Sequence, residues 1–129
     1  EIINKAQILS LHLPQTKKTV GFFNRSFIEK MKNPFWLINT SRGKVVVTED
    51  LVEGLKTKKI LGAGLDVLEY ESNSFNSITN SNKIAPSLEY LIKSDKVLLS
   101  PHVAGWTYES HKKLALTIVK KIRDLRLTN

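Results

Sequence analysis

Three segments of the sequence carry side chains that could bind and protonate a small organic acid. The first is NTSRG at residues 39–43, which directly follows a short apolar run. Arg42 offers a planar fork of N–H donors that can bind a carboxylate or phosphate through two parallel hydrogen bonds. Gly43 allows the backbone to turn or to approach a ligand closely. A polar turn with a solvated arginine is an equally good interpretation of this segment on its own.

The other two segments add carboxylates and a histidine. Asp66, Glu69 and Glu71 lie at or after the end of an apolar run at residues 60–68, and His102 follows another run at residues 96–100. A protonated histidine beside a carboxylate can donate a proton to a carbonyl oxygen. An arginine nearby can bind the substrate carboxylate and polarise the keto group. This combination suits reduction of a 2-keto acid by a hydride donor. Considered one at a time, the histidine could simply cap the end of a strand, and the carboxylates could be solvated surface residues.

The apolar runs are the segments that must position these residues. Runs at residues 6–13, 35–38, 60–68 and 96–100 are typical of short buried strands. Helices are expected at residues 25–32 with Asn24 as N-cap, at 49–59 with Thr48 as N-cap, and at 87–92. A last helix is expected from residue 108 to about 125, capped by Thr107. Residues 72–83 are rich in Ser and Asn, which predicts a long irregular loop.

Strands that alternate with helices predict an α/β fold. Right-handed βαβ units would give a parallel sheet of about four strands, covered by helices on both faces. Such sheets bind ligands beyond the carboxyl ends of their strands, so Arg42, the carboxylates and His102 should gather at one edge. The small residues Gly62, Ala63 and Gly64 predict close packing against a neighbouring backbone.

Composition narrows the class of protein. The chain has 129 residues, 41% of them hydrophobic, and carries 20 basic and 12 acidic residues for a net charge of +8. This charge invites a nucleic-acid interpretation, but the lysines are scattered, which favours solvated helix surfaces. Because there is no cysteine, disulfides and thiolate metal sites are excluded, and no metal site is predicted. No apolar run is long enough to span a membrane, so a cytoplasmic protein is expected. Because the chain does not begin with Met, we also expect it to be a piece of a longer protein.

Four motifs in order carry a family resemblance: LHLP-x-T-x-x-T, then MK followed by LINTSRG, then GAGLDVLEYE, then LLSPHVAGWT. Over residues 6 to about 121 the chain resembles the nicotinamide-binding domain of the D-isomer-specific 2-hydroxyacid dehydrogenases. The resemblance implies a homodimeric oxidoreductase that acts on a small 2-keto or 2-hydroxy acid with NAD, NADP being left open. No G-x-G-x-x-G motif follows a strand. Residues 1–129 would therefore be the C-terminal half of a Rossmann-like doubly wound sheet, with a last helix that returns toward a substrate domain.

The resemblance also implies roles for single residues. Arg42 would bind the substrate carboxylate, His102 would be the acid/base, and Glu71 would hydrogen-bond and tune that histidine. Asp66 would hold the nicotinamide carboxamide, whereas Glu69 matches no catalytic position and would be ordinary surface. The positions that would line the cofactor are Leu13, Pro14, Thr19, Thr40, Ser41, Arg42, Asp66, His102 and Gly105.

Two residues depart from the family pattern, and two other classes of protein stay open. Ser72 follows Glu71 where most members of the family have proline, and Ser41 stands where alanine is usual. Transcriptional corepressors that sense a bound dinucleotide share the fold, so a binding protein of that kind is the alternative to an enzyme. Binding of nucleic acid through the basic surface is a third interpretation. The chain by itself is expected to be inactive.

Overall fold

The computed structural model describes residues 1–70 and 85–126, so the loop expected at residues 72–83 and the predicted acid Glu71 lie outside the described residues. The described elements, in chain order, are α1 (Ile2–Lys5), β1 (Ile8–Leu11), α2 (Arg25–Lys30), β2 (Phe35–Asn39), the 3-10 turn η1 (Gly43–Val45), α3 (Thr48–Lys56), β3 (Ile60–Leu65), α5 (Pro86–Lys93), β4 (Val97–Leu99) and α6 (Tyr108–Arg126).

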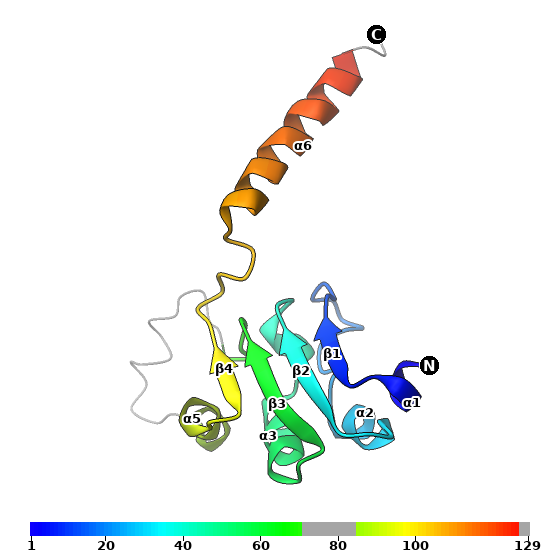
Figure 1. The fold of residues 1–129 in the computed structure, drawn as a ribbon, viewed down its shortest axis with the longest axis vertical. Helices are drawn as coiled ribbons and strands as arrows, with labels where there is room; N and C mark the ends of the chain where they lie inside the picture. The colour runs from blue at the N-terminus through cyan, green and yellow to red at the C-terminus, as the bar shows by residue number, and fades with distance from the viewer. Residues whose placement is uncertain (71–84, 127–129) are drawn as a thin grey trace.

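The four strands form one parallel sheet in the order β1-β2-β3-β4 (Figure 1). Leu9 of β1 pairs with Leu37 of β2, which pairs with Ala63 of β3. Three strands, β1, β3 and β4, are shorter than the apolar runs that predicted them, because the last residues of those runs already belong to the turns at the carboxyl edge. In contrast, β2 extends one residue beyond its run, to Asn39. The predicted α/β fold with four parallel strands is confirmed.

The helices between the strands pack in one layer, since α3 contacts both α2 and α5. This layer covers the sheet face that carries Leu37 and Leu65, and both side chains are buried. On the opposite face Trp36 is 50% exposed and Leu98 is 75% exposed. The expectation that helices cover both faces is therefore wrong for the described part of the chain.

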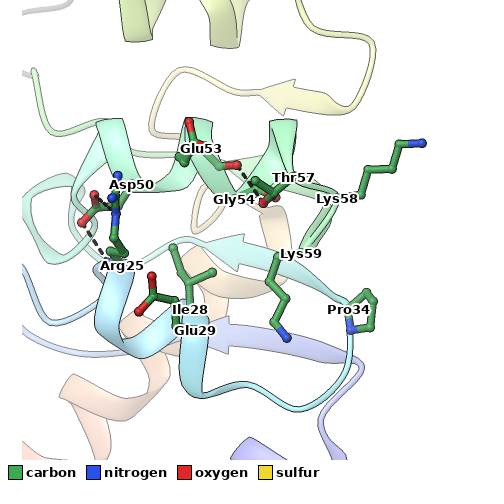
Figure 2. A pocket seen from close by; sticks show the side chains of 10 residues that line it. All are labelled: Arg25, Ile28, Glu29, Pro34, Asp50, Glu53, Gly54, Thr57, Lys58 and Lys59. Atoms are coloured by element: carbon green, nitrogen blue, oxygen red, sulfur yellow. Dashed lines mark hydrogen bonds and ion pairs between the residues drawn. The ribbon is translucent and has the colours of Figure 1, made fainter.

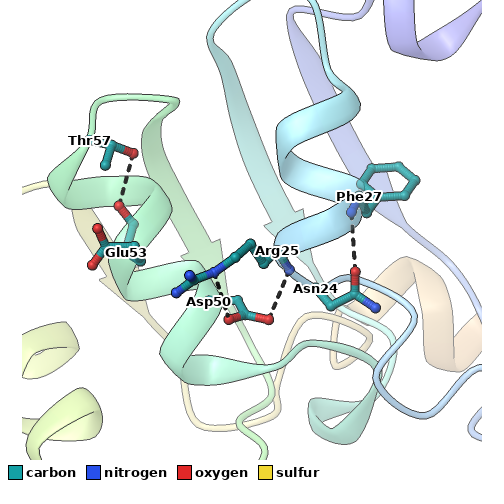
Figure 3. Close-up of polar contacts among 6 residues, drawn as sticks. All are labelled: Asn24, Arg25, Phe27, Asp50, Glu53 and Thr57. Atoms are coloured by element: carbon teal, nitrogen blue, oxygen red, sulfur yellow. Dashed lines mark hydrogen bonds and ion pairs between the residues drawn. The ribbon is translucent and has the colours of Figure 1, made fainter.

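Polar contacts at the start of α2 fasten it to α3 (Figure 3). The side chain of Asn24 accepts a hydrogen bond from the Phe27 N–H at 3.1 Å, which confirms the predicted N-cap. The Arg25 N–H donates to the Asp50 carboxylate on α3 at 2.8 Å, and the Arg25 guanidinium lies 3.8 Å from the same carboxylate. The helix ends at Lys30, two residues earlier than predicted, because the ψ of Met31 is 128°, outside the helical range. The Met31 side chain is buried.

The start of α3 differs from the prediction. Thr48 is the first residue of the helix rather than its cap. Its N–H and its hydroxyl both donate to one carboxylate oxygen of Glu69, at 2.9 and 2.8 Å. A carboxylate at a helix N-terminus satisfies a free N–H and interacts favourably with the helix dipole. Glu69 is therefore the cap of α3, and its interpretation as ordinary surface is wrong.

The last helix, α6, extends away from the sheet (Figure 1). The Ser110 N–H donates to the Thr107 hydroxyl at 3.1 Å, which confirms the predicted cap. The apolar residues that repeat along α6 at helical spacing are exposed: Leu114, Ile118, Ile122 and Leu125. None of the helices in the described residues is both long and apolar enough to cross a membrane.

Candidate active site at the carboxyl ends of the strands

The turn that carries Arg42 is organised by Asn39, the last residue of β2. Asn39 is 1% exposed. Its side-chain oxygen accepts hydrogen bonds from the N–H and the hydroxyl of Ser41, at 3.1 and 2.8 Å, and its side-chain nitrogen donates to the Arg42 carbonyl at 3.2 Å. The Arg42 guanidinium donates to the Ser41 carbonyl at 2.6 Å, and Arg42 is exposed. The buried side-chain amide of Asn39 thus holds the backbone of the Arg42 turn, and both polar atoms of this amide are hydrogen-bonded within the turn.

Gly43 is required by the chain itself rather than by a ligand. A Cβ added to Gly43 would lie 1.9 Å from the carbonyl oxygen of Leu68 and 2.7 Å from the backbone nitrogen of Glu69. Only a residue without a side chain allows the segment after β3 to pass this close to the Arg42 turn. The sequence suggested a turn or a close approach to a ligand, and the structure assigns the close approach to the backbone of residues 68 and 69.

Asp66 is the buried centre of the next turn. It is 4% exposed, and its carboxylate accepts hydrogen bonds from the Ser100 hydroxyl at 2.6 Å, the Val103 N–H at 2.8 Å and the Ala104 N–H at 3.0 Å. Burial raises the pKa of Asp66, but these hydrogen bonds and the charge of the nearby His102 outweigh burial and hold the pKa below its usual value. Asp66 is therefore an ionised carboxylate at neutral pH.

His102 lies on the turn after β4 and connects to both neighbouring strand ends. Its N–H donates to the carbonyl oxygens of Asp66 and Ser100, each at 3.0 Å, and its backbone has a φ of 56°. The Asp66 N–H in turn donates to the Asn39 carbonyl at 3.0 Å. A continuous network therefore joins the turns that carry Arg42 and His102, with both side chains exposed at the same sheet edge.

The remaining predicted cofactor positions divide into exposed residues and residues that support loops. Thr40 and Gly105 are exposed at the sheet edge, and Leu13 lines a cavity of about 670 Å³ beside β1. The Thr19 hydroxyl donates to the exposed Pro14 carbonyl at 2.5 Å, so it closes the loop after β1. Ser41 is buried, and its hydroxyl donates to the Asn39 side chain.

The segment just before Glu71 is anchored to two helices. The Tyr70 hydroxyl donates to the Glu49 carboxylate on α3 at 2.7 Å and lies 2.9 Å from the Ser87 hydroxyl on α5. The hydrogen bond from Tyr70 lowers the pKa of Glu49, and burial raises the pKa of Tyr70. Sequence reasoning missed this anchor and the Glu69 cap because both depend on residues distant in the sequence.

A second cavity lies at the opposite edge of the sheet, between α2 and α3 (Figure 2). It has a volume of about 540 Å³. Arg25 and Asp50 in its wall are already paired with each other. Pro34 and Lys59, which directly precede β2 and β3, place it at the amino ends of the strands, away from Arg42 and His102. It is therefore separate from the candidate active site. Its lining residues are Arg25, Ile28, Glu29, Pro34, Asp50, Glu53, Gly54, Thr57, Lys58 and Lys59.

Comparison with known proteins identifies the family. Residues 1–104 match the family model described as D-isomer specific 2-hydroxyacid dehydrogenase, NAD binding domain. The chain belongs to this family. The match takes in the Arg42 and His102 turns, so both turns lie within the NAD-binding domain.

Individual relatives agree with this assignment. The chain is 40% identical to a glyoxylate reductase of Thermofilum pendens over 88% of this chain and 30% of the relative. It is 33% identical to a D-lactate dehydrogenase of Staphylococcus aureus over 88% of this chain and 35% of the relative. A crystal structure of D-lactate dehydrogenase with NAD⁺ from Lactobacillus jensenii superposes with a TM-score of 0.75 at 35% identity, covering 84% of this chain and 33% of that chain.

The chain thus spans about a third of the length of these relatives. All three relatives are dehydrogenases or reductases, and they give no support to the corepressor alternative.

Proposed function

We propose that the protein containing this chain reduces 2-keto acids to D-2-hydroxy acids with NADH, and that this chain supplies both the cofactor surface and the acid/base residue. The observation that carries the proposal is the backbone network that joins Asn39, Asp66 and His102 across three adjacent strand ends. Because of this network, an exposed arginine and an exposed histidine face the same edge of a parallel sheet, where such folds bind their ligands.

The two exposed side chains, Arg42 and His102, have separate roles toward the substrate. Arg42 binds the carboxylate of the keto acid through two parallel hydrogen bonds and draws electron density from the adjacent keto group. His102 donates its proton to the keto oxygen as negative charge develops there, and it accepts that proton back in the reverse direction. Glu71 is the residue that would hydrogen-bond the His102 imidazole, as the family resemblance implies.

The residues at the sheet edge fit a nicotinamide cofactor. Within the described part of the chain, Oδ2 of Asp66 accepts a hydrogen bond from the Ala104 N–H, and a carboxylate oxygen has room for a second donor such as a carboxamide N–H. Thr40 and Gly105 are exposed beside it, and a Cβ at Gly105 would meet no other atom within 4 Å. When bound, the cofactor supplies the hydride that the carbonyl carbon receives.

The test is a pair of substitutions in the full-length protein with a matched control elsewhere in the chain. His102→Ala should lower turnover roughly 10²- to 10⁴-fold, the usual contribution of a general acid. Arg42→Lys should lower kcat/KM on the order of 10- to 100-fold, because one charged hydrogen bond of the clamp is lost. Arg123→Lys on α6 makes the same exchange at an exposed position outside the candidate site and should leave turnover unchanged. NADH oxidation with a panel of 2-keto acids measures each effect, and wild-type turnover by His102→Ala would refute the mechanism.

The proposal extends to the whole protein. We infer a cytoplasmic homodimer that binds no nucleic acid, in which residues 1–129 form the second half of the cofactor domain. The absence of cysteine supports the cytoplasmic location, and the scattered lysines support the exclusion of nucleic acid. Size-exclusion chromatography with light scattering tests the dimer. Retention on DNA at physiological salt would contradict the exclusion of nucleic acid.

A further inference from the structure

The turn that carries His102 holds this residue in a backbone conformation that non-glycine residues seldom adopt. The φ of 56° lies in the left-handed region, which glycine enters freely but which crowds the Cβ of other residues. Among the described residues, Lys58 is the other non-glycine residue with positive φ, and it lies at the amino end of β3, at the far edge of the sheet. Such a conformation persists only where the surrounding structure determines it.

Hydrogen bonds bracket His102 on both sides. Before it, the Ser100 N–H donates to the Leu65 carbonyl at 3.0 Å, which ties the end of β4 to the end of β3. After it, the N–H groups of Val103 and Ala104 both donate to the Asp66 carboxylate. The orientation of that single carboxylate therefore sets the path of the chain on the far side of His102.

The Ser100 hydroxyl is the group that fixes this carboxylate. It donates at 2.6 Å to Oδ1 of Asp66, the same oxygen that accepts from Val103 at 2.8 Å. A short hydrogen bond to an ionised acceptor is stronger than a neutral one. Without the Ser100 hydroxyl, the described hydrogen bonds to the Asp66 carboxylate would come only from Val103 and Ala104, the residues whose position the carboxylate has to fix. Rotation of the carboxylate and movement of the turn would then be coupled.

We propose that Ser100 is a positioning residue for the reaction: its hydroxyl fixes the Asp66 carboxylate, which in turn keeps His102 in the left-handed conformation that aims the imidazole at the substrate. The proposal rests on the proposed function, since it assigns Ser100 a role only if His102 is the proton donor. It predicts a specific kinetic signature, because the Arg42 turn is held separately by Asn39 and does not depend on Ser100. Loss of the hydroxyl should therefore affect proton donation and leave substrate binding nearly unchanged.

The experiment compares three variants of the full-length protein. Ser100→Ala removes the hydroxyl, and Ser100→Thr retains it. Ser94→Ala is the matched control, because the Ser94 hydroxyl accepts a backbone hydrogen bond from Lys96 at the opposite end of β4. Ser100→Ala should lower the single-turnover rate of NADH oxidation about tenfold, since small errors in the position of a reacting group cost one to two orders of magnitude. The KM for the keto acid should stay within about twofold, Ser100→Thr should restore the rate, and Ser94→Ala should match the wild type.

Hydrogen exchange supplies a readout that does not depend on activity. In Ser100→Ala, the amides of Val103 and Ala104 should exchange about tenfold faster than in the wild type, and in Ser100→Thr they should be protected again. A wild-type rate in Ser100→Ala, or a slower rate without faster exchange at these amides, would overturn the proposal. If the wild type turned over no keto acid, the proposed function would fail, and the role of Ser100 in positioning a proton donor would fail with it. Faster exchange in Ser100→Ala would then still establish that the hydroxyl holds the turn.

Discussion

Replacing glycines with alanine at two positions on the carboxyl side of the sheet should change stability in opposite directions. At Gly43 the new Cβ would lie 1.9 Å from the Leu68 carbonyl oxygen and 2.1 Å from its carbon. Both are backbone atoms, so no side-chain rotation can relieve the clash, and the chain after β3 must move to make room. At Gly64 of β3 the new Cβ would meet nothing within 4 Å, so the close packing predicted at this glycine is wrong, whereas at Gly62 it would lie 2.9 Å from the Lys96 carbonyl oxygen.

The expected magnitudes follow from these distances. Overpacking against a rigid neighbour costs about 1–3 kcal/mol and sometimes more, and a clash with backbone belongs at the upper end of this range. We therefore expect Gly43→Ala to lower the free energy of unfolding by at least about 3 kcal/mol. Gly64→Ala should raise it by about 0.4–1 kcal/mol, because alanine restricts the unfolded chain without straining the strand.

Urea unfolding followed by circular dichroism measures both changes. With a slope of about 1–3 kcal/mol per molar urea, the midpoint of Gly43→Ala should fall by at least about 1 M, and that of Gly64→Ala should rise slightly. Equal midpoints for the two variants would refute the placement of residues 68 and 69 against the Arg42 turn. A Gly43→Ala protein as stable as the wild type would do the same.

Three other predictions concern the cap of α3, the charge of Asp66 and the isolated chain. In the same urea assay, Glu69→Ala should lower the free energy of unfolding by about 2 kcal/mol, because two hydrogen bonds from Thr48 to the Glu69 carboxylate are lost. The control Glu53→Ala, on the exposed face of α3, should change it little. The Asp66 pKa is depressed in the folded state, so its contribution to stability is fully present above its unfolded pKa of about 3.9 and is lost as the pH falls through the folded value. Asp66→Asn should therefore flatten the loss of urea midpoint below about pH 4, and an unchanged acid profile would contradict this assignment. The 129-residue chain alone should show no NADH oxidation with any 2-keto acid, because Arg42 and His102 are open to water in it. Measurable turnover by this chain would contradict the prediction, because it would show that catalysis does not require water to be excluded from these two side chains.

Local signals in the sequence predicted the elements well. Asn24 and Thr107 cap helices that begin one residue later, and each accepts a hydrogen bond from three residues ahead. The apolar runs predicted four parallel strands in the observed chain order. Short-range patterns succeed in these cases because the partners lie within one helical turn or on one strand.

Sequence reasoning failed where the partner is distant. Thr48 has the right type and place for an N-cap, but Glu69, 21 residues away, supplies the carboxylate instead. Ser100 and Asp66 are 34 residues apart and meet only because β3 and β4 are neighbours. No spacing rule connects such pairs. The exposed Trp36 face was missed for a related reason: alternation in a strand shows two faces but not which elements cover each one.

Asn39 and Asp66 are buried polar side chains at the sheet edge, and each holds a different turn. Asn39 satisfies its amide within the Arg42 turn, and Asp66 satisfies its carboxylate within the His102 turn. The described connection between them is a backbone hydrogen bond, from the Asp66 N–H to the Asn39 carbonyl, which changes of side chain leave in place. A change at either anchor should therefore disturb mainly its own turn. Under the proposed function, this arrangement would let Arg42 vary in position while His102 keeps its place, in keeping with relatives that are named for different substrates, glyoxylate and D-lactate.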